Sequence, residues 1–172
     1  MARRIAKFHK VSFEQFKEGY ADTFGLLEDG EIQKIYDAVK LPKRATAGSA
    51  GYDFFAPVSI ELKPGETIKI PTGIRVEIEE DWVLKCYPRS GLGFKYRLQL
   101  NNTVGIIDSD YFYSDNEGHI FAKITNDTNE GKVVEIEAGT GFMQGIFVEY
   151  GITADDDVTA VRNGGFGSTT GN

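Results

Sequence analysis

Residues 67–87 read TIKIPTGIRVEIEEDWVLKCY and contain three short β-type runs in succession. The first two, 67–70 and 74–78, alternate apolar and polar residues around the turn sequence Pro71-Thr72-Gly73, as half-buried strands do. The third, 82–87, is mostly apolar. Further β-type runs, without helix-length patterns between them, occur at 120–124, 132–136, 142–150 and 157–161. Many short strands at roughly ten-residue spacing predict an all-β sandwich, jelly roll or distorted barrel.

The first forty residues have a different pattern, which predicts a helix. Ser12-Phe13-Glu14-Gln15 has the form of a capping box, whose side chains satisfy free N–H groups at a helix start. Phe16 and Tyr20 follow Phe13 at helical spacing. We expect a short amphipathic helix over about residues 12–20, packed on the main domain.

The C-terminal residues 162–172 are rich in glycine and offer only Phe166 for burial, so they predict a mobile arm. The expected organisation is therefore an N-terminal extension (1–40), one β domain (41–161) and this arm. A chain of 172 residues fits one domain with a sizeable core.

Composition excludes several function classes. The net charge of −7 argues against a broad surface for duplex nucleic acid, although a few arginines can still hold a small anion. No apolar run approaches the roughly 20 residues that cross a bilayer, and the N-terminus lacks the apolar stretch of a secretory signal. We therefore expect a cytoplasmic protein without a membrane association. The single cysteine, Cys86, lies in an apolar run and is expected to be a buried hydrophobe rather than a nucleophile.

Residues 88–93 (PRSGLG) follow a strand and combine a guanidinium, a hydroxyl and two glycines. Arg89 can pair with a phosphate, and the glycines let backbone N–H groups approach an anion. The alternative is an ordinary glycine turn with a solvated arginine.

Residues 105–111 (GIIDSDY) place two carboxylates and an aromatic directly after an apolar run. Asp108 or Asp110 could act as a general base for water or attract a cation. The structural alternative is that one of them caps a turn. Asp53, among aromatic residues, could likewise be structural or face a metal, and His9 and His119 are too few for a metal cluster.

Taken in order, five segments resemble the motifs of the homotrimeric dUTPase family. They are 50–53 (AGYD), 88–93, 105–111, 141–144 (GFMQ) and 162–169 (RNGGFGST), and they cover the chain from about residue 40 to its end.

The resemblance implies a distorted jelly-roll or β-clip barrel, a tight homotrimer with shared active sites, and hydrolysis of dUTP to dUMP and pyrophosphate. This reaction limits uracil incorporation into DNA and supplies dUMP for thymidylate synthesis. By the same resemblance, Asp108 activates the attacking water, and Mg²⁺ is held by the phosphates with Asp53 contacting it through water. Uracil is expected in a hairpin pocket around 101–107 and 119–123, with Tyr111 under the deoxyribose. The substrate-binding residues implied are Arg89, Ser90, Gly91, Asn102, Gly105, Ile106, Ile107, Tyr111, Phe121, Gln144, Arg162, Phe166, Gly167, Ser168 and Thr169.

Three features depart from the family pattern. Six residues, 112–117, separate Tyr111 from Gly118 where one is usual, and we interpret them as a longer hairpin tip outside the pocket. Gly141 stands where an arginine is common, and Asn163 alone separates Arg162 from Gly164.

Three other functions compete with this interpretation. A dCTP deaminase or bifunctional deaminase of the same fold would need an acidic residue in the base pocket, where Asn102 offers an amide. A dUTP-sensing regulatory module, with a protein partner, could use the N-terminal helix and residues 112–117. A purely structural β-sandwich would not explain the glycine-rich end.

Overall fold

The structure, a computed structural model, describes residues 3–162 and residue 164. The expected site residues Phe166, Gly167, Ser168 and Thr169 lie outside the described residues. The strands are β1 (Ala6–Lys10), β2 (Lys43–Arg44), β3 (Tyr52–Phe55), β4 (Ile60–Leu62), β5 (Thr67–Pro71), β6 (Ile74–Ile78), β7 (Trp82–Pro88), β8 (Leu98–Leu100), β9 (Gly105–Ile107), β10 (Phe121–Asn126), β11 (Val134–Ile136) and β12 (Gly141–Glu149). The helices are α1 (Phe13–Phe24), α2 (Asp29–Ala38), α3 (Ser90–Tyr96) and the 3₁₀ helix η1 (Ser109–Tyr113).

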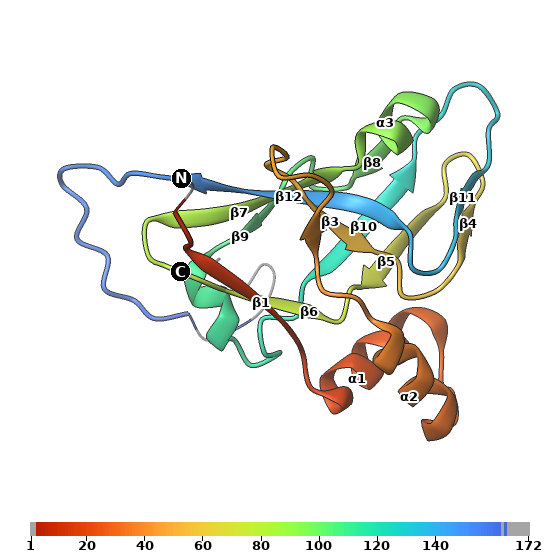
Figure 1. Cartoon of the computed structure of the whole chain (residues 1–172), viewed down its shortest axis with the longest axis horizontal. Helices are drawn as coiled ribbons and strands as arrows, with labels where there is room; N and C mark the ends of the chain where they lie inside the picture. Colours follow the sequence, from red (N-terminus) through yellow and green to blue (C-terminus); the bar gives the residue numbers. More distant parts are fainter. Residues whose placement is uncertain (1–2, 163, 165–172) are drawn as a thin grey trace.

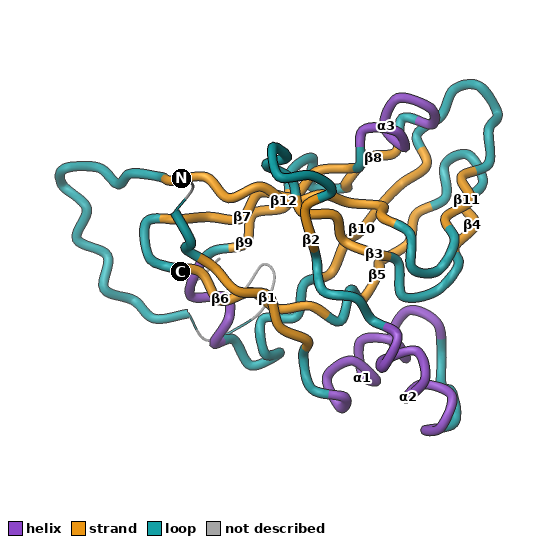
Figure 2. The backbone as a smooth tube through the Cα atoms, in the orientation of Figure 1, coloured by secondary structure: helices purple, strands orange, loops and turns teal. Residues whose placement is uncertain are grey.

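The strands form four antiparallel sheets, the largest in the order β2-β3-β12-β7-β9. A three-stranded sheet has the order β5-β10-β8, and β1-β6 and β11-β4 form two-stranded pairs (Figures 1 and 2). The expected all-β fold class is confirmed, with short helices added to the sheets.

Period-two burial explains why these segments are strands. Ile74, Val76 and Ile78 of β6 are buried while the residues between them are more exposed, as the sequence pattern predicts. Phe54, Leu84 and Phe142 from the large sheet fill the same core.

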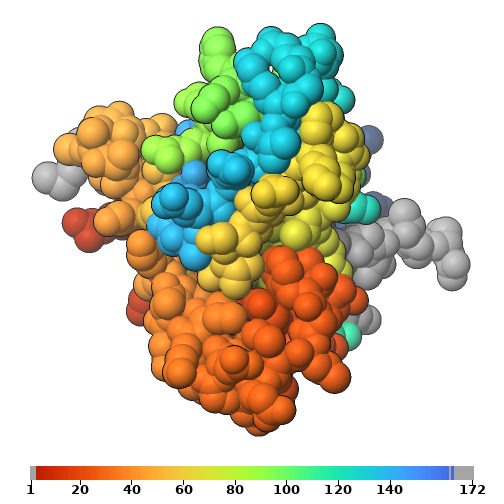
Figure 3. Space-filling model, turned by 90° about the vertical axis from the view of Figure 1, so that its right-hand side faces the viewer, coloured from red at the N-terminus to blue at the C-terminus, as the bar shows by residue number. Residues whose placement is uncertain are grey.

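The N-terminal segment is part of this core. β1 pairs with β6, and α1 begins where the hydroxyl of Ser12 accepts a hydrogen bond from the amide of Gln15, as the capping box predicts. Helix α1 runs to Phe24, beyond the expected end at residue 20. Phe16 of α1 and Ile32 of α2 are buried in the core. Figure 3 shows residues 13–38, in red to orange, forming one end of the molecule below the strands.

Helices α2 and α3 and the 3₁₀ helix η1 were not anticipated. Helix α2 and its C-cap do carry apolar residues at helical spacing, Ile32, Ile35, Tyr36 and Val39, and they pack against the core. This pattern could have predicted the helix. Helix α3 contains two glycines and buries no residue, which is why its sequence resembled a turn.

The prediction of a strand at 157–161 is wrong. These residues are irregular and exposed, with Val158 and Val161 74% and 82% exposed. Within the described part of the chain no neighbouring strand pairs with them. A β-type pattern without a pairing edge does not form a strand. Among residues 3–162 and 164, no helix is long and apolar enough to cross a membrane.

Candidate active site

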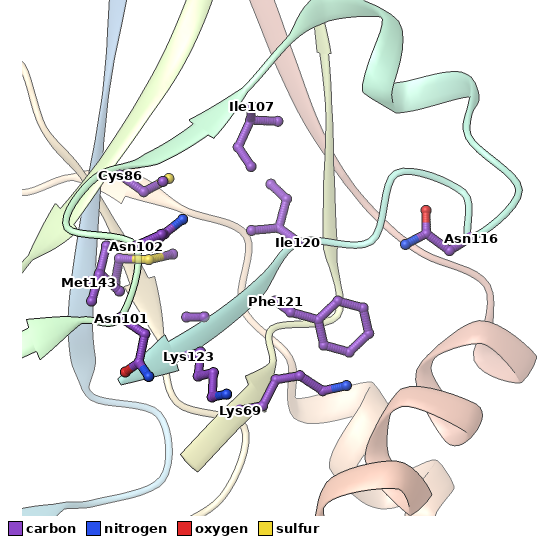
Figure 4. Close-up of a pocket in the computed structure, with 13 residues that line it drawn as sticks. Lys69, Cys86, Asn101, Asn102, Ile107, Asn116, Ile120, Phe121, Lys123 and Met143 are labelled. Atoms are coloured by element: carbon purple, nitrogen blue, oxygen red, sulfur yellow. The ribbon is translucent and has the colours of Figure 1, made fainter. Parts of the chain in front are cut away.

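A cavity of about 400 Å³ opens between β10 and the segment that joins β8 to β9 (Figure 4). Four residues expected in the base pocket, Asn102, Gly105, Ile107 and Phe121, line it. Ile106 does not line it, because alternation in β9 turns this side chain outward, where it is 46% exposed. The other lining residues are Lys69, Cys86, Leu100, Asn101, Asn116, Ile120, Ala122, Lys123 and Met143. An apolar cavity with a few amide groups suits an aromatic ring with hydrogen-bonding edges.

Close packing of β9 on β7 forms the floor of the cavity. A Cβ atom at Gly105 would lie 3.1 Å from the Cβ atom of Cys86, its partner on β7, so glycine permits the close approach. Cys86 is buried, and burial raises the pKa of its thiol to about 12. The thiol is therefore neutral, and its burial agrees with the expected role of a small hydrophobe.

Asn116 is a lining residue that sequence reasoning missed. Residues 112–117 were expected outside the pocket, and this placement is wrong for Asn116. The chain turns back after η1 because Oδ1 of Asn116 accepts a hydrogen bond from the amide of Gly118 at 3.2 Å. Asn-Glu-Gly is a recognisable Asx-turn sequence, and this signal could have predicted the turn, although not its place beside the pocket.

A second cluster gathers Asp108, Asp110 and Arg162. Nη2 of Arg162 donates to Oδ2 of Asp108 at 2.7 Å, and Nε donates to Oδ1 of Asp110 at 2.8 Å. The aspartate side chains are about half exposed, whereas the Arg162 side chain is 13% exposed. Asp108 precedes η1, but its carboxylate makes no capping hydrogen bond, so it does not take the turn-capping role. Its carboxylate can therefore interact with a cation or water.

Tyr111 lies directly beside this acidic cluster. The Arg162 guanidinium carbon is 5.9 Å from the Tyr111 ring centroid. Tyr111 is 3% exposed, and burial is the main cause that raises the pKa of its hydroxyl. The neutral hydroxyl donates to the carbonyl of His119 at 2.6 Å and accepts from Nδ2 of Asn116 at 3.0 Å.

A third cluster surrounds Arg89 at the other end of β7. Its Nε lies 3.8 Å from Oδ1 of Asp53, and its Nη1 donates weakly to the Gly141 carbonyl at 3.5 Å. A Cβ atom at Gly141 would lie 3.4 Å from Cγ of Asp53 and 3.5 Å from Nη1 of Arg89, so the glycine adjoins both groups. A shallow hollow here is lined by Arg89, Ser90, Gly91, Leu92, Glu135, Ile136, Thr140 and Gly141.

Gln144 belongs to the same region. It lies opposite Asp53 across the β12–β3 pair. A Cβ atom at Gly51 would lie 2.7 Å from Oε1 of Gln144, so the glycine leaves the space that this amide occupies. A guanidinium, an amide and a carboxylate are therefore close together, a set of groups that can bind a phosphate and a hydrated cation.

One chain does not bring Arg89 and Asp108 together. Ile107 of β9 pairs with Leu84 of β7, and Asp108 is one residue further toward the start of β7. Arg89 is five residues beyond Leu84 in the opposite direction. At about 3.3 Å per residue, the two backbones are roughly 20 Å apart along the strand. Figure 1 accordingly shows α3 and the helical turn after β9 at opposite ends of β7. Within a single chain the two side chains cannot contact the same phosphate group.

Metal ligation by protein side chains alone is not evident. No group of three or more His, Cys, Asp or Glu side chains that could hold a metal occurs in the part of the chain that the structure describes. A cation bound near Asp53 or Asp108 would need further oxygen ligands, which a polyphosphate supplies.

Comparison with known proteins gives a consistent result. A sequence model described as dUTPase matches residues 37–170. The deoxyuridine 5'-triphosphate nucleotidohydrolase of Lactococcus lactis subsp. lactis (strain IL1403) is 43% identical over 135 residues, which cover 76% of this chain and 88% of the relative. The corresponding protein of Haemophilus influenzae (strain PittEE) is 39% identical over 142 residues, covering 78% and 89%.

Solved structures agree with this match. The crystal structure of dUTPase from Streptococcus mutans superposes with a TM-score of 0.59 at 38% identity, covering 68% of this chain and 90% of that chain. A variant dUTPase from phage phi11 of S. aureus, described as coordinating a structural Mg(II) ion, has a TM-score of 0.58 at 22% identity, covering 72% and 92%. At that identity the likeness concerns the fold alone.

Proposed function

The chain belongs to the dUTPase family and hydrolyses dUTP to dUMP, and from this premise we propose that Asp108 activates the attacking water in active sites that several copies of the chain complete. The observation that carries the proposal is the separation of Arg89 from Asp108 by about 20 Å along β7. Phosphate-binding groups and a general base must act on the same triphosphate. A homotrimer, in which Arg89 of one subunit faces Asp108 of another, satisfies this requirement.

In the proposed reaction, one carboxylate oxygen of Asp108 accepts a proton from water as the water oxygen attacks the α-phosphorus. The bond from the α-phosphorus to the bridging oxygen breaks, and pyrophosphate leaves in line with the attack. The half-exposed carboxylate of Asp108 is accessible for this role. Its partner Arg162 must first release it, and the triphosphate offers Arg162 an alternative anion.

Charge on the phosphates is neutralised by the Arg89 cluster. Arg89 and Gln144 supply donors, together with the hydroxyl of Ser90 and the backbone of Gly91. Asp53, 3.8 Å from the Arg89 guanidinium, fits the role of holding a magnesium-bound water, because carboxylate oxygen and water are ligands that Mg²⁺ prefers. When bound to the phosphates, Mg²⁺ supplies positive charge that stabilises the transition state.

Uracil is proposed to bind in the cavity of Figure 4, between Phe121, Asn102 and the backbone of β9. Cytosine would reverse the donors and acceptors at its edge and leave buried polar groups unpaired. Such mismatches can cost a factor of about 10⁴–10⁵. Among the described residues that line the cavity there is no carboxylate, and this supports dUTP hydrolysis over the deaminase alternative, which would need one.

The arm from Arg162 to residue 172 is proposed to close over the site once nucleotide binds. Arg162 then contacts phosphate, Phe166 stacks on uracil, and Ser168 and Thr169, with the backbone of Gly167, contact the γ-phosphate. We further propose that the protein acts in the cytoplasm.

The decisive experiment measures pyrophosphate release from dUTP, dCTP, dTTP and UTP, with and without magnesium. We expect hydrolysis of dUTP that magnesium stimulates, and little from the others. Ammonia release from dCTP would contradict the proposed substrate.

Site sharing is tested by mixing two inactive variants, Asp108→Asn and Arg89→Ala, and refolding them together. If the two residues act across subunits, mixed trimers contain sites with both residues intact and activity returns. Refolding each variant alone is the control. No recovery from verified mixed trimers would place both residues of one site in the same chain.

A further inference from the structure

Two segments outside the common family pattern contact each other. The family match begins at residue 37, so β1 and α1 precede it. Residues 112–117, called the insert, are six residues where the resemblance implies one between Tyr111 and the next glycine. The hydroxyl of Ser12 donates to Oε1 of Glu117 at 2.5 Å, and the amide of Ser12 donates to Oε2 at 2.7 Å. The helix start of α1 therefore holds the end of the inserted segment.

Charge strengthens this contact. Burial raises the pKa of Glu117, but the hydrogen bonds from Ser12 and the charge of Arg75 outweigh burial and lower the pKa below its usual value. Glu117 is thus an ionised acceptor for two donors, the stronger kind of hydrogen bond. Its backbone has a φ of 59°, a conformation that costs energy in a non-glycine residue and needs surrounding contacts to hold it.

The other end of the insert is held by β6. Arg75 donates to the carbonyl of Phe112 at 2.6 Å, and its guanidinium carbon lies 3.7 Å from the Phe112 ring centroid. Because both ends are fixed, the residue between them that faces the cavity, Asn116, has a defined position.

Asn116 connects this clamped segment to Tyr111. Its Nδ2 donates to the Tyr111 hydroxyl at 3.0 Å, and its side chain also lines the cavity. Figure 4 shows Asn116 beyond Phe121, at the end of the cavity nearest the loop that follows η1. A shift of the insert would therefore reach both the cavity and the Tyr111 hydroxyl through this one side chain.

The position of Tyr111 indicates which part of the nucleotide is affected. Ile107 lines the cavity, Asp108 follows immediately, and Tyr111 lies one helical turn later. A nucleotide with its base in the cavity and its α-phosphate beside Asp108 must place its sugar between them, next to Tyr111.

We infer that Asn116 is a positioning residue that fixes Tyr111 against the sugar. The Ser12–Glu117 contact holds Asn116 in place. The N-terminal segment and the insert together therefore set the discrimination between deoxyribose and ribose. The inference rests on the proposed function. Without Asn116 the Tyr111 hydroxyl loses one hydrogen bond and keeps its bond to the His119 carbonyl, so the ring is less firmly fixed and admits a 2′-hydroxyl more readily.

The test compares kcat/KM for dUTP with kcat/KM for UTP, in full-length wild type and variants. Asn116→Ala should lower this ratio about fivefold, which is the effect of roughly one neutral hydrogen bond. Tyr111→Phe should lower it as well, and the double variant should be no worse than the poorer single variant, because Asn116 acts through the Tyr111 hydroxyl. Discrimination against dCTP should stay unchanged, since the uracil contacts are proposed for Phe121, Asn102 and the backbone of β9, and Asn116 lies at the other end of the cavity from Asn102.

Glu117→Gln and Ser12→Ala keep the fold's core intact and provide a milder perturbation. Each should lower the dUTP/UTP ratio about twofold to threefold, because each weakens the contact that holds Asn116 without removing its side chain. Glu18→Gln, on the exposed face of α1, is the matched control and should not change the ratio.

Two results would overturn the inference. One is an unchanged dUTP/UTP ratio in folded Asn116→Ala or in Glu117→Gln. The other is additive losses in the Asn116→Ala, Tyr111→Phe double variant, which would show that Asn116 acts independently of the hydroxyl. Failure of the wild type to hydrolyse dUTP would instead contradict the proposed function.

Discussion

The buried histidine at position 119 leads to a prediction about stability and pH. Nε2 of His119 accepts a hydrogen bond from the amide of Gly73 at 2.9 Å, so this nitrogen carries no proton. The ring also lies against Phe121, with centroids 4.2 Å apart. Burial, as the largest cause, lowers the pKa of His119 to about 3, and Lys69 also lowers it while Glu117 raises it. Protonation would break the bond to Gly73 and place a charge in the core.

The size of the effect follows from proton linkage. The unfolded chain binds a proton at this histidine below about pH 6.5, whereas the folded chain stays neutral down to about pH 3. The contribution of neutral His119 is therefore complete above pH 6.5 and decreases as the pH falls. Between pH 7 and pH 5 the free energy of unfolding should fall by about 2 kcal/mol from this group alone.

The assay is urea unfolding at pH 7 and pH 5 at one fixed protein concentration. His119→Gln keeps an acceptor for the Gly73 amide but cannot titrate, so its stability should lose about 2 kcal/mol less between the two pH values than the wild type does. His9→Gln, at the other histidine of the chain, is the matched control. If wild type and His119→Gln show the same pH dependence, the histidine is not held neutral by the fold and the reasoning is refuted.

Three further predictions concern the core, the phosphate cluster and the base. Gly19→Ala should destabilise the protein by about 1–2 kcal/mol in thermal or urea unfolding, because the new Cβ would lie 2.9 Å from a ring atom of His119. Gly30→Ala, which has open space around it, is the control and should be neutral or slightly stabilising. Gly51→Ala should leave stability nearly unchanged but raise KM for dUTP, because its Cβ would displace the amide of Gln144; an unchanged KM would remove Gln144 from the binding site. Asp108→Asn should lower kcat by about 10²–10⁴-fold and keep dUTP affinity, measured by calorimetry, within about tenfold; near-normal turnover would identify another group as the base. Asp127→Asn, on an exposed ion pair with Arg97, is the control for the last variant.

Local sequence patterns were sufficient for several elements. Alternation over 67–78 predicted β5 and β6, and the capping box at Ser12 predicted the start of α1. These features depend on residues that are neighbours in the chain, so the sequence contains the information directly. Helix α2 was overlooked although its apolar residues recur at helical spacing. The strand predicted at 157–161 was wrong because a strand needs a pairing partner, which the local pattern does not show.

The base pocket was predicted as a hairpin arrangement, and Asn116 among its lining residues was missed. Asn102, Gly105, Ile107 and Phe121 do share one cavity, because two strands and their connection bring them together. The position of Asn116 in the same cavity depends on an Asx turn and on the contact between Glu117 and Ser12, which are 105 residues apart in the chain.

The sequence by itself determined the residue types, the strand pattern and the family to which the chain belongs. Only the tertiary structure decided which of these residues can act together, since the register between β7 and β9 places Asp108 and Arg89 at opposite ends of a strand. Strand register depends on hydrogen bonds between segments that are distant in sequence. Each residue along a strand adds about 3.3 Å, so the distance between Asp108 and Arg89 follows from the strand pairing and not from their motifs.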